Sequence, residues 1–322
     1  MDMQKTLSYP DDVDLAKLHT DLEKVYQVST YLDFPFTAGE VADYFLPGLN
    51  ISGQQLQELL ATQKFADIPF EISGRYLLIH DSQSLSERTQ REKMSAAKLN
   101  SAENFATTLA KGVPFIRTIA VTGSVAYGSA EKWDDTDLFI VTKQRRLWLS
   151  AFMMLVYVRL AKLFHLRPLH LSLFCLSYVH DELGFATEAS RNMHSPLFAR
   201  EILKAKPVAG KSNYRKLLLE NNWVKEIYTK PYREKLSEFD RNGINGISKR
   251  DRPWAAFEIL LDWAEGLAFT FLSRYLCLRA YLTNLRLKSE GRNNRVFEPK
   301  MSRMSCVYTS NFYEWLHALW GQ

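Results

Sequence analysis

Cysteine is scarce in this chain of 322 residues. The three cysteines, Cys175, Cys277 and Cys306, lie far apart and lack the close spacing of a metal site or a redox motif. We therefore expect buried thiols, no disulfide framework and a reducing compartment. The first residues also lack the basic segment followed by an apolar run that marks a signal peptide. Both absences predict a cytoplasmic protein.

Long apolar runs are missing as well. The most apolar stretch, residues 147–158, ends at Arg159 after about a dozen residues, whereas a bilayer requires roughly twenty. We predict a buried core helix here and no membrane partner. With 46% hydrophobic and 24% charged residues, the chain has the composition of a globular protein, and its length suggests two or three domains.

Positively charged residues are few in the first 80 residues, which hold 12 acidic and 5 basic side chains, for a net charge of −7. The rest of the chain holds 24 acidic and 36 basic side chains, for a net charge of +12. The acidic part shows a helical pattern over 13–31, capping boxes at Thr37 and Ser52, and a hairpin turn at Gly74. This succession of three helices and a hairpin resembles a winged-helix domain.

The charge of this first region argues against DNA as a partner. The helix that would read DNA carries Glu58 and a single cation, Lys64, which is too little to neutralise several phosphates. We expect a structural or partner-docking role for the region. A nucleic-acid-binding regulator is the weakest of the three functions considered below.

A strand followed by a Gly-Ser turn stands near the middle of the chain. Residues 115–122, FIRTIAVT, are apolar and β-branched, so they predict a buried strand. Gly123 and Ser124 follow at once. Glycine lets a phosphate approach the backbone closely, and the serine hydroxyl adds a hydrogen bond. The turn is therefore a candidate phosphate-binding element.

Two aspartates open the next strand. In DDTDLFIVT, side chains alternate across the strand, so Asp135 and Asp137 share one face while Thr136 and Leu138 share the other. Neighbouring carboxylates repel each other, and a divalent cation relieves the repulsion. Oxygen ligands suit Mg²⁺, whose shell phosphates and water complete. The pair therefore predicts a metal site.

Together, Gly123-Ser124 and Asp135-x-Asp137 resemble the signature of the DNA polymerase beta-like nucleotidyltransferase superfamily. The resemblance implies that Gly-Ser holds a triphosphate and that the aspartates hold Mg²⁺ or Mn²⁺. It also implies transfer of a nucleoside monophosphate from a nucleoside triphosphate, ATP among the candidates, to an acceptor hydroxyl, with release of pyrophosphate. The resemblance does not identify the acceptor, and the candidates are a small molecule, a protein and the end of an RNA. The layout resembles a bacterial branch that also carries an N-terminal winged helix.

The turn departs from the family pattern in its charge. Family members often carry arginines there, whereas this chain has Val125 and Tyr127. Lys143, Arg145 and Arg146, just past the aspartate strand, are candidates to clamp the triphosphate, and an ordinary solvated strand end is the alternative.

The third carboxylate of the family is missing too. The strand expected to carry it, residues 168–177, offers only His170 and Ser172 as polar candidates. His170 is the candidate catalytic base, while Asp181, Glu182 or Glu188 could fold back instead. This absence makes a catalytically weakened nucleotide-binding or scaffold protein the second functional hypothesis.

The predicted fold class is α/β, or α+β: a nucleotidyltransferase-like sheet with helices on its faces. We expect a winged-helix-like domain over 1–82, a connecting helix over 83–111, a catalytic domain over 112–235 and a helical C-terminal region over 236–322. In the catalytic domain, Pro207 to Gly210 is predicted to be a loop, and His194 and Glu201 are candidates to line the cleft. A homo-oligomer or a protein partner is possible through the first or the last region.

Overall fold

The computed structural model describes residues 14–62, 68, 70–79, 85–163, 174–241, 257–290 and 296–320. The chain divides into two compact units. The first comprises Met1–Arg88 and Lys225–Arg233, and the second comprises Thr89–Val224 and Glu234–Gln322. Three helices cross the division along the chain: α4 (Leu85–Gly112), α10 (Val224–Ile227) and α11 (Thr229–Arg241).

The first unit contains three helices and a small antiparallel sheet of strand order β1-β3-β2 among its described residues. These elements are α1 (Leu15–Leu32), β1 (Phe36–Thr37), α2 (Ala38–Tyr44), α3 (Gly53–Leu60), β2 (Glu71–Ser73) and β3 (Tyr76–Leu78). Both predicted capping boxes are present, at Thr37 with Glu40 and at Ser52 with Gln55. The predicted helices and hairpin are therefore confirmed. Segment 225–233 adds to this unit, where the Gly48 N–H donates to the Ile227 carbonyl at 2.9 Å.

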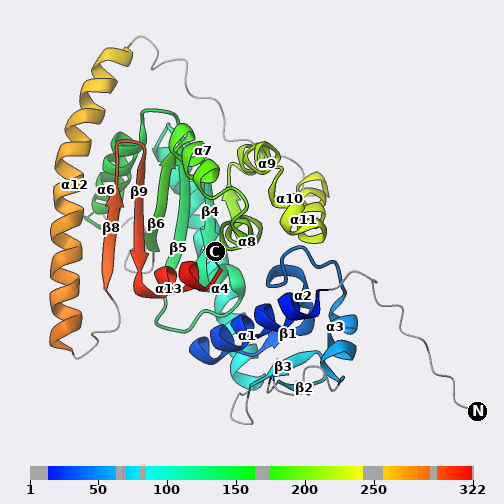
Figure 1. The fold of residues 1–322 in the computed structure, drawn as a ribbon. Coiled ribbons are helices and arrows are strands. Elements are labelled where there is room, and N and C mark those ends of the chain that lie inside the picture. Colours follow the sequence, from blue (N-terminus) through cyan, green and yellow to red (C-terminus); the bar gives the residue numbers. More distant parts are fainter. Residues whose placement is uncertain are drawn as a thin grey trace, which may run out of the picture. The chain divides into compact units, whose positions relative to one another are not determined.

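The second unit is built on a mixed sheet of strand order β7-β4-β5-β6-β9-β8. Figure 1 shows these strands side by side, with β8 at the edge next to α12. The elements are β4 (Ile116–Thr122), α5 (Gly123–Tyr127), β5 (Thr136–Thr142), α6 (Leu147–Leu163), β6 (Phe174–Asp181), α7 (Glu182–Arg191), α8 (Pro196–Lys204), β7 (Lys206–Ala209), α9 (Lys211–Glu220), α12 (Glu258–Ser289), β8 (Phe297–Met301), β9 (Ser305–Ser310) and α13 (Asn311–Trp320). Strands β5 and β6 are parallel, and the other neighbours are antiparallel. The mixed α/β class predicted from the sequence is thus confirmed.

The C-terminal region differs from the helical region expected over 236–322. Its hairpin of β8 and β9 joins the sheet, where Val179 of β6 pairs with Cys306 of β9. The loop expected from Pro207 to Gly210 differs too, because β7 covers most of it and pairs with β4 as a strand. Both differences have one physical cause: β7 and β9 pair with strands distant in sequence, which local patterns do not reveal.

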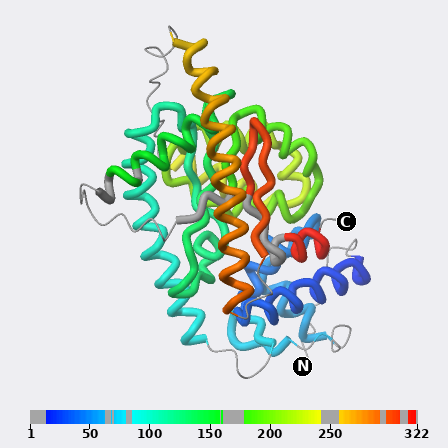
Figure 2. Tube along the Cα trace, turned by 90° about the vertical axis from the view of Figure 1, so that its left-hand side faces the viewer, coloured from blue at the N-terminus to red at the C-terminus, as the bar shows by residue number. Residues whose placement is uncertain are grey.

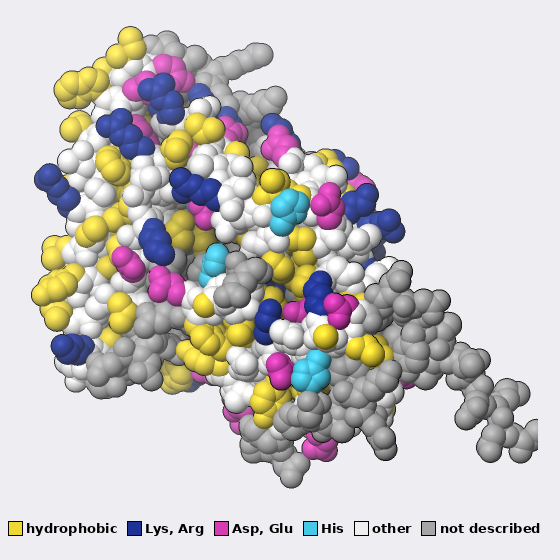
Figure 3. Space-filling view, viewed as in Figure 1, with side chains coloured by type: hydrophobic (Ala, Val, Ile, Leu, Met, Phe, Trp, Pro, Cys, Tyr) yellow, Lys and Arg dark blue, Asp and Glu magenta, His cyan; other side chains and the backbone are white. Residues whose placement is uncertain are grey.

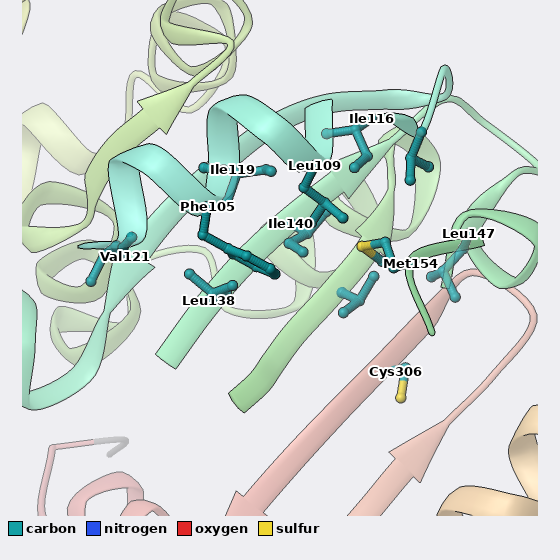
Figure 4. Close-up of a cluster of buried hydrophobic side chains, with 14 of the residues drawn as sticks. Phe105, Leu109, Ile116, Ile119, Val121, Leu138, Ile140, Leu147, Met154 and Cys306 are labelled. Carbon is teal, nitrogen blue, oxygen red and sulfur yellow. The ribbon is translucent and has the colours of Figure 1, made fainter. Parts of the chain in front are cut away.

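The main core lies on one face of the sheet. Phe105 and Leu109 of α4 pack there against Ile119 and Leu138, as Figure 4 shows. Helix α6 contributes Trp148, which is 1% exposed, and Met154 to the core, but Phe152 and Val156 of the same apolar run are exposed, so the predicted buried core helix is buried on one side only. Along the described stretches of the chain, no helix is both long enough and apolar enough to cross a bilayer.

The opposite face of the sheet is lined by aromatic rings. Phe139 of β5 lies 5.5 Å from Phe185 and 6.2 Å from Tyr214, measured between ring centroids. His180 of β6 lies 6.3 Å from both Phe139 and Phe185. Burial lowers the pKa of His180 to about 4, because the charged imidazolium would lose its water. Its Nδ1 has no hydrogen-bond partner in the described part of the structure.

We expect His180 to make the protein sensitive to acid. The imidazole takes up a proton near pH 6.5 in the unfolded chain but only near pH 4 in the folded one, so the unfolded state binds more protons between these values. Lowering the pH from 7 to 4.5 should therefore cost about 2–3 kcal/mol through this group. Urea unfolding at pH 7 and at pH 4.5 measures this loss of stability. His180→Phe, which keeps an aromatic ring, should lose correspondingly less stability, and an equal loss in both proteins would contradict the assignment.

Candidate functional site

The pairing of β4 with β5 brings the two halves of the sequence motif together. Thr122, the last residue of β4, lies opposite Asp137 in the antiparallel register, and Val121 lies opposite Leu138. Because Gly123 follows Thr122 directly, the Gly-Ser turn meets the aspartate pair at one end of the sheet. The sequence predicted each half separately, and the strand register places them side by side.

Gly123 and Asp137 approach each other more closely than any other residue type at position 123 would permit. A Cβ atom built on Gly123 would lie 2.2 Å from Oδ2 of Asp137, which is far inside van der Waals contact. Gly123 also has a φ of 63°, in the left-handed region that favours glycine. The carboxylate therefore fills the space that a side chain would occupy.

From Thr136 to Ile140, side chains alternate between the buried and the more exposed face of β5, as the sequence predicts. Thr136 and Leu138 are buried against the core, whereas Asp137 is half-buried and Asp135 is exposed just before β5 begins. Carboxylate oxygens are hard donors that suit Mg²⁺. Within the described ranges, no group of three or more histidine, cysteine, aspartate or glutamate side chains is placed to hold a metal. The pair would therefore need substrate and water oxygens to complete a metal shell.

The structure places no third carboxylate beside the pair among the residues that it describes. In the parallel register of β5 and β6, Asp137 lies opposite Cys175. Positions 174–177 of β6 carry no acid. His170 and Ser172, the predicted candidates, lie outside the described residues.

The three acids considered as substitutes lie elsewhere. Asp181 pairs with Thr142 at the other end of β5, about 16 Å along the strand from Asp137. Its carboxylate accepts hydrogen bonds from the Gly184 and Arg145 backbone N–H groups at 2.7 and 2.8 Å. The next residue, Glu182, pairs with Arg117 at 3.3 Å. Neither acid folds back to the metal site, because each is held at the start of α7.

Glu188, the third of these acids, makes a hydrogen bond at the C-terminal end of its own helix, α7. Its side chain accepts a hydrogen bond from Asn192 at 2.9 Å.

Lys143 and Arg145 lie at this same far end. Lys143 pairs with Glu258 of α12 at 3.0 Å, and Arg145 pairs with Asp262 at 3.0 Å. The adjacent Arg146 is buried and contacts both acids. The structure does not bring these cations to the aspartates, because a residue that follows β5 must lie at the end of the strand opposite Asp137. They fasten α12 to the sheet instead.

A different cluster of lysines lies at the motif end of the sheet. Lys206 opens β7 and lies opposite Val121, two residues before Gly123. Lys235 is buried and donates to the Ala205 carbonyl at 2.7 Å. Burial, helped by the charges of Lys206 and Lys204 and opposed by Glu238, lowers the pKa of Lys235 to about 8. Sequence reasoning missed these lysines because it treated the neighbouring segment as a loop. The only local signal was the alternation of lysines in KAKP.

Glu201 of α8 is a second group that the strand motif does not reveal. Its carboxylate accepts a hydrogen bond from the hydroxyl of Tyr127 on α5 at 2.7 Å. Burial raises the pKa of Glu201, although the nearby positive charge of Arg200 opposes the shift. A carboxyl group with a raised pKa is suited to accept a proton. His194, the other predicted cleft residue, lies with its ring 6.2 Å from that of Trp223.

A cavity of about 490 Å³ opens between α7 and α9, lined in part by Arg117, Val141 and Asn213. Val141 lies four residues beyond Asp137 along β5, so the cavity is separate from the motif end of the sheet. Comparison with protein-family models, with curated proteins and with solved structures gave no match to the chain.

The contact between Gly123 and Asp137 predicts an unequal response to two glycine substitutions. Gly123→Ala should lower the free energy of unfolding by at least about 2 kcal/mol more than Gly128→Ala. Both glycines have positive φ, but a Cβ on Gly128 would meet nothing closer than Glu92 Cγ at 3.8 Å. Gly128→Ala therefore controls for backbone strain in urea unfolding. Similar losses in the two variants would show that Asp137 does not pack against the turn as described.

Proposed function

We propose that the second unit binds a nucleoside triphosphate with Mg²⁺ and transfers its nucleoside monophosphate to an acceptor hydroxyl. The observation that carries the proposal is the contact of the Asp137 carboxylate with Gly123, imposed by the register of β4 and β5. This contact puts a candidate metal ligand beside a backbone that a phosphate can approach.

The residues at the turn fit a metal-bound triphosphate. Asp135 and Asp137 would hold Mg²⁺ or Mn²⁺, which suits their oxygen donors. When bound, such an ion neutralises charge on the phosphates and aligns the reacting groups. Gly123 leaves the backbone open to a phosphate, and the Ser124 hydroxyl can donate a hydrogen bond to it.

The positive charge that the turn lacks can come from α8. Lys204 places its Nζ 5.4 Å from the centre of the Tyr127 ring on α5, the helix that begins at Gly123. Lys206 lies opposite Val121 and therefore starts on the core face of the sheet, whereas Asp137 lies on the other face. We therefore assign the phosphate-facing charge to Lys204 in place of Lys143 and Arg145.

The reaction also requires a group that accepts a proton. The acceptor oxygen forms a bond to the α-phosphorus, the bond from that phosphorus to the β-phosphate oxygen breaks, and pyrophosphate leaves. The hydroxyl proton passes to a base. His170 stays a prediction for this role, and Glu201 is the alternative that the structure supports through its position beside α5.

Nucleotide binding without turnover is the second candidate. It is favoured by the lack of an acid at 174–177, next to Asp137 in the sheet. Binding needs only the metal and phosphate contacts, whereas transfer also needs an oriented and deprotonated acceptor. Nucleotide binding with no pyrophosphate release, across pools of small molecules, proteins and RNA, would favour this candidate over the transferase.

Asp137→Asn should lower the affinity for Mg²⁺-nucleotide by at least about tenfold, since it removes a ligand charge but keeps the side-chain shape. Titration calorimetry with each of the four nucleoside triphosphates measures this. Asp134→Asn is the matched control, because the Asp134 carboxylate accepts a hydrogen bond from the Glu131 N–H within the preceding turn. Unchanged affinity in Asp137→Asn, or equal losses in both variants, would refute the metal assignment.

A further inference from the structure

Helix α12 exposes an unusual number of large apolar side chains. Nine of them along its length are each at least 46% exposed: Ile259, Leu260, Trp263, Leu267, Phe271, Leu278, Tyr281, Leu282 and Leu285. Figure 3 shows hydrophobic side chains along the edge where α12 lies, and Figure 2 shows this helix running along the side that faces the viewer. A contiguous apolar surface of this extent on a folded protein marks an interaction site.

The helix is nevertheless firmly attached by its other side. Ala268 and Leu272 are buried in the main core, and the Glu265 carboxylate accepts hydrogen bonds from the Trp148 and Leu149 N–H groups at 2.8 and 2.7 Å. The exposed side chains are therefore held in a fixed row on an anchored helix. We call this row the α12 stripe.

The stripe has the spacing of a helix-pairing seam. One series of residues seven apart comprises Leu260, Leu267, Arg274 and Tyr281. A second series begins four residues later and comprises Ala264, Phe271, Leu278 and Leu285. Apart from Arg274 both series are apolar, and two apolar series at heptad spacing are the pattern by which one helix packs along another. The stripe therefore fits a helical partner of similar length.

Charge along α12 selects the direction of that partner. Its acidic side chains, Glu258, Asp262 and Glu265, all lie in the first quarter of the helix, whereas its basic ones, Arg274, Arg279, Arg286 and Lys288, all follow. A parallel second copy would set the basic halves side by side. An antiparallel copy keeps the two basic halves apart and so avoids this repulsion, while the acids stay on the attached side of α12, where Glu258 and Asp262 pair with cations that follow β5 and Glu265 accepts from the α6 backbone.

An antiparallel copy also matches the apolar series. When the two-fold axis passes between residues 272 and 273, Leu260 lies opposite Leu285 and Leu267 lies opposite Leu278. At the centre Phe271 faces Arg274, a pairing in which a guanidinium can stack on a ring. If each of the nine side chains exposes on the order of 90 Å², the stripe offers roughly 800 Å² per copy, which is what a stable interface buries.

We propose that the α12 stripe pairs with the same stripe of a second copy, in an antiparallel arrangement with two-fold symmetry. The apolar groove between α6 and α12, lined by Val156, Leu160, Phe271 and Tyr275, widens the same surface. A two-fold axis makes the surface self-complementary, as a closed dimer requires. The proposed dimer does not depend on the proposed nucleotide chemistry, so each can be tested without the other.

Light scattering coupled to size exclusion tests the dimer on the full chain. The wild type should have about twice the 37.3 kDa of one chain, and Leu267→Lys should have the mass of one chain, because it sets a charge against Leu278 twice per dimer. Leu219→Lys replaces an apolar side chain that is 44% exposed on α9 and should remain a dimer. Circular dichroism checks that each variant stays folded. A monomeric wild type, or a dimeric Leu267→Lys, would overturn the proposal.

The direction of pairing is tested by cross-linking with a short bis-maleimide in a Cys277→Ser background. In the antiparallel pair, two copies of a cysteine at Thr270 lie about 8 Å apart along the axis, whereas two copies at Lys288 lie about 46 Å apart. Thr270→Cys should therefore cross-link and Lys288→Cys should not. Efficient cross-linking through position 288 would show a parallel pair. A monomer that binds lipid vesicles through the stripe would replace the second copy with a membrane surface and reject the proposal.

Discussion

The register between β4 and β5 is the constraint on which the candidate site depends. A shift of one residue would turn every side chain of β5 to the other face and send Asp137 into the apolar core. That slip is opposed by Ile119, Val121, Leu138 and Ile140, which are fully buried on the core face. The same apolar packing that stabilises the sheet thus also fixes the carboxylate against Gly123.

The two ends of β5 have different chemistry. At one end, the Asp137 carboxylate lies against the Gly123 turn, and Lys204 of α8 lies beside the Tyr127 ring of α5. At the other, Arg146 is buried between Glu258 and Asp262 and fastens α12 to the sheet. A buried guanidinium needs such partners, since an unpaired charge there would carry a large desolvation cost. Charge therefore serves a structural purpose at the far end of β5, whereas the motif end carries the carboxylates of the candidate site.

The sequence alone predicted those features that depend on local pattern. The strand ahead of Gly123, the facing of Asp137 away from Thr136 and Leu138, and the capping boxes at Thr37 and Ser52 all follow from neighbouring residues, and the structure confirms them. Features that require distant partners could not be predicted. The sheet places of β7 and β9 are set by pairing across more than 80 residues, and β8 joins the sheet through β9, so the lysines near the turn and the strands of the C-terminal region were missed.

The cations at 143 and 145 illustrate the same limit. Their closeness to the aspartates in sequence suggested closeness in space, but an extended strand of seven residues carries them to the opposite end of the sheet. No acidic residue occupies positions 174–177, whereas the role of His170 is still a prediction. Sequence distance along a strand is thus a poor guide to which charges share a site.

The central claim is that Asp135 and Asp137 hold a divalent cation against a triphosphate at the Gly123-Ser124 turn. Anomalous diffraction at the manganese edge, from crystals grown with Mn²⁺ and a non-hydrolysable nucleoside triphosphate analogue, tests it most directly. We predict an anomalous peak within ligand distance of both carboxylates, with the phosphates against the backbone at Gly123. A nucleotide bound elsewhere, such as in the cavity between α7 and α9, with no manganese at the aspartates, would contradict the account.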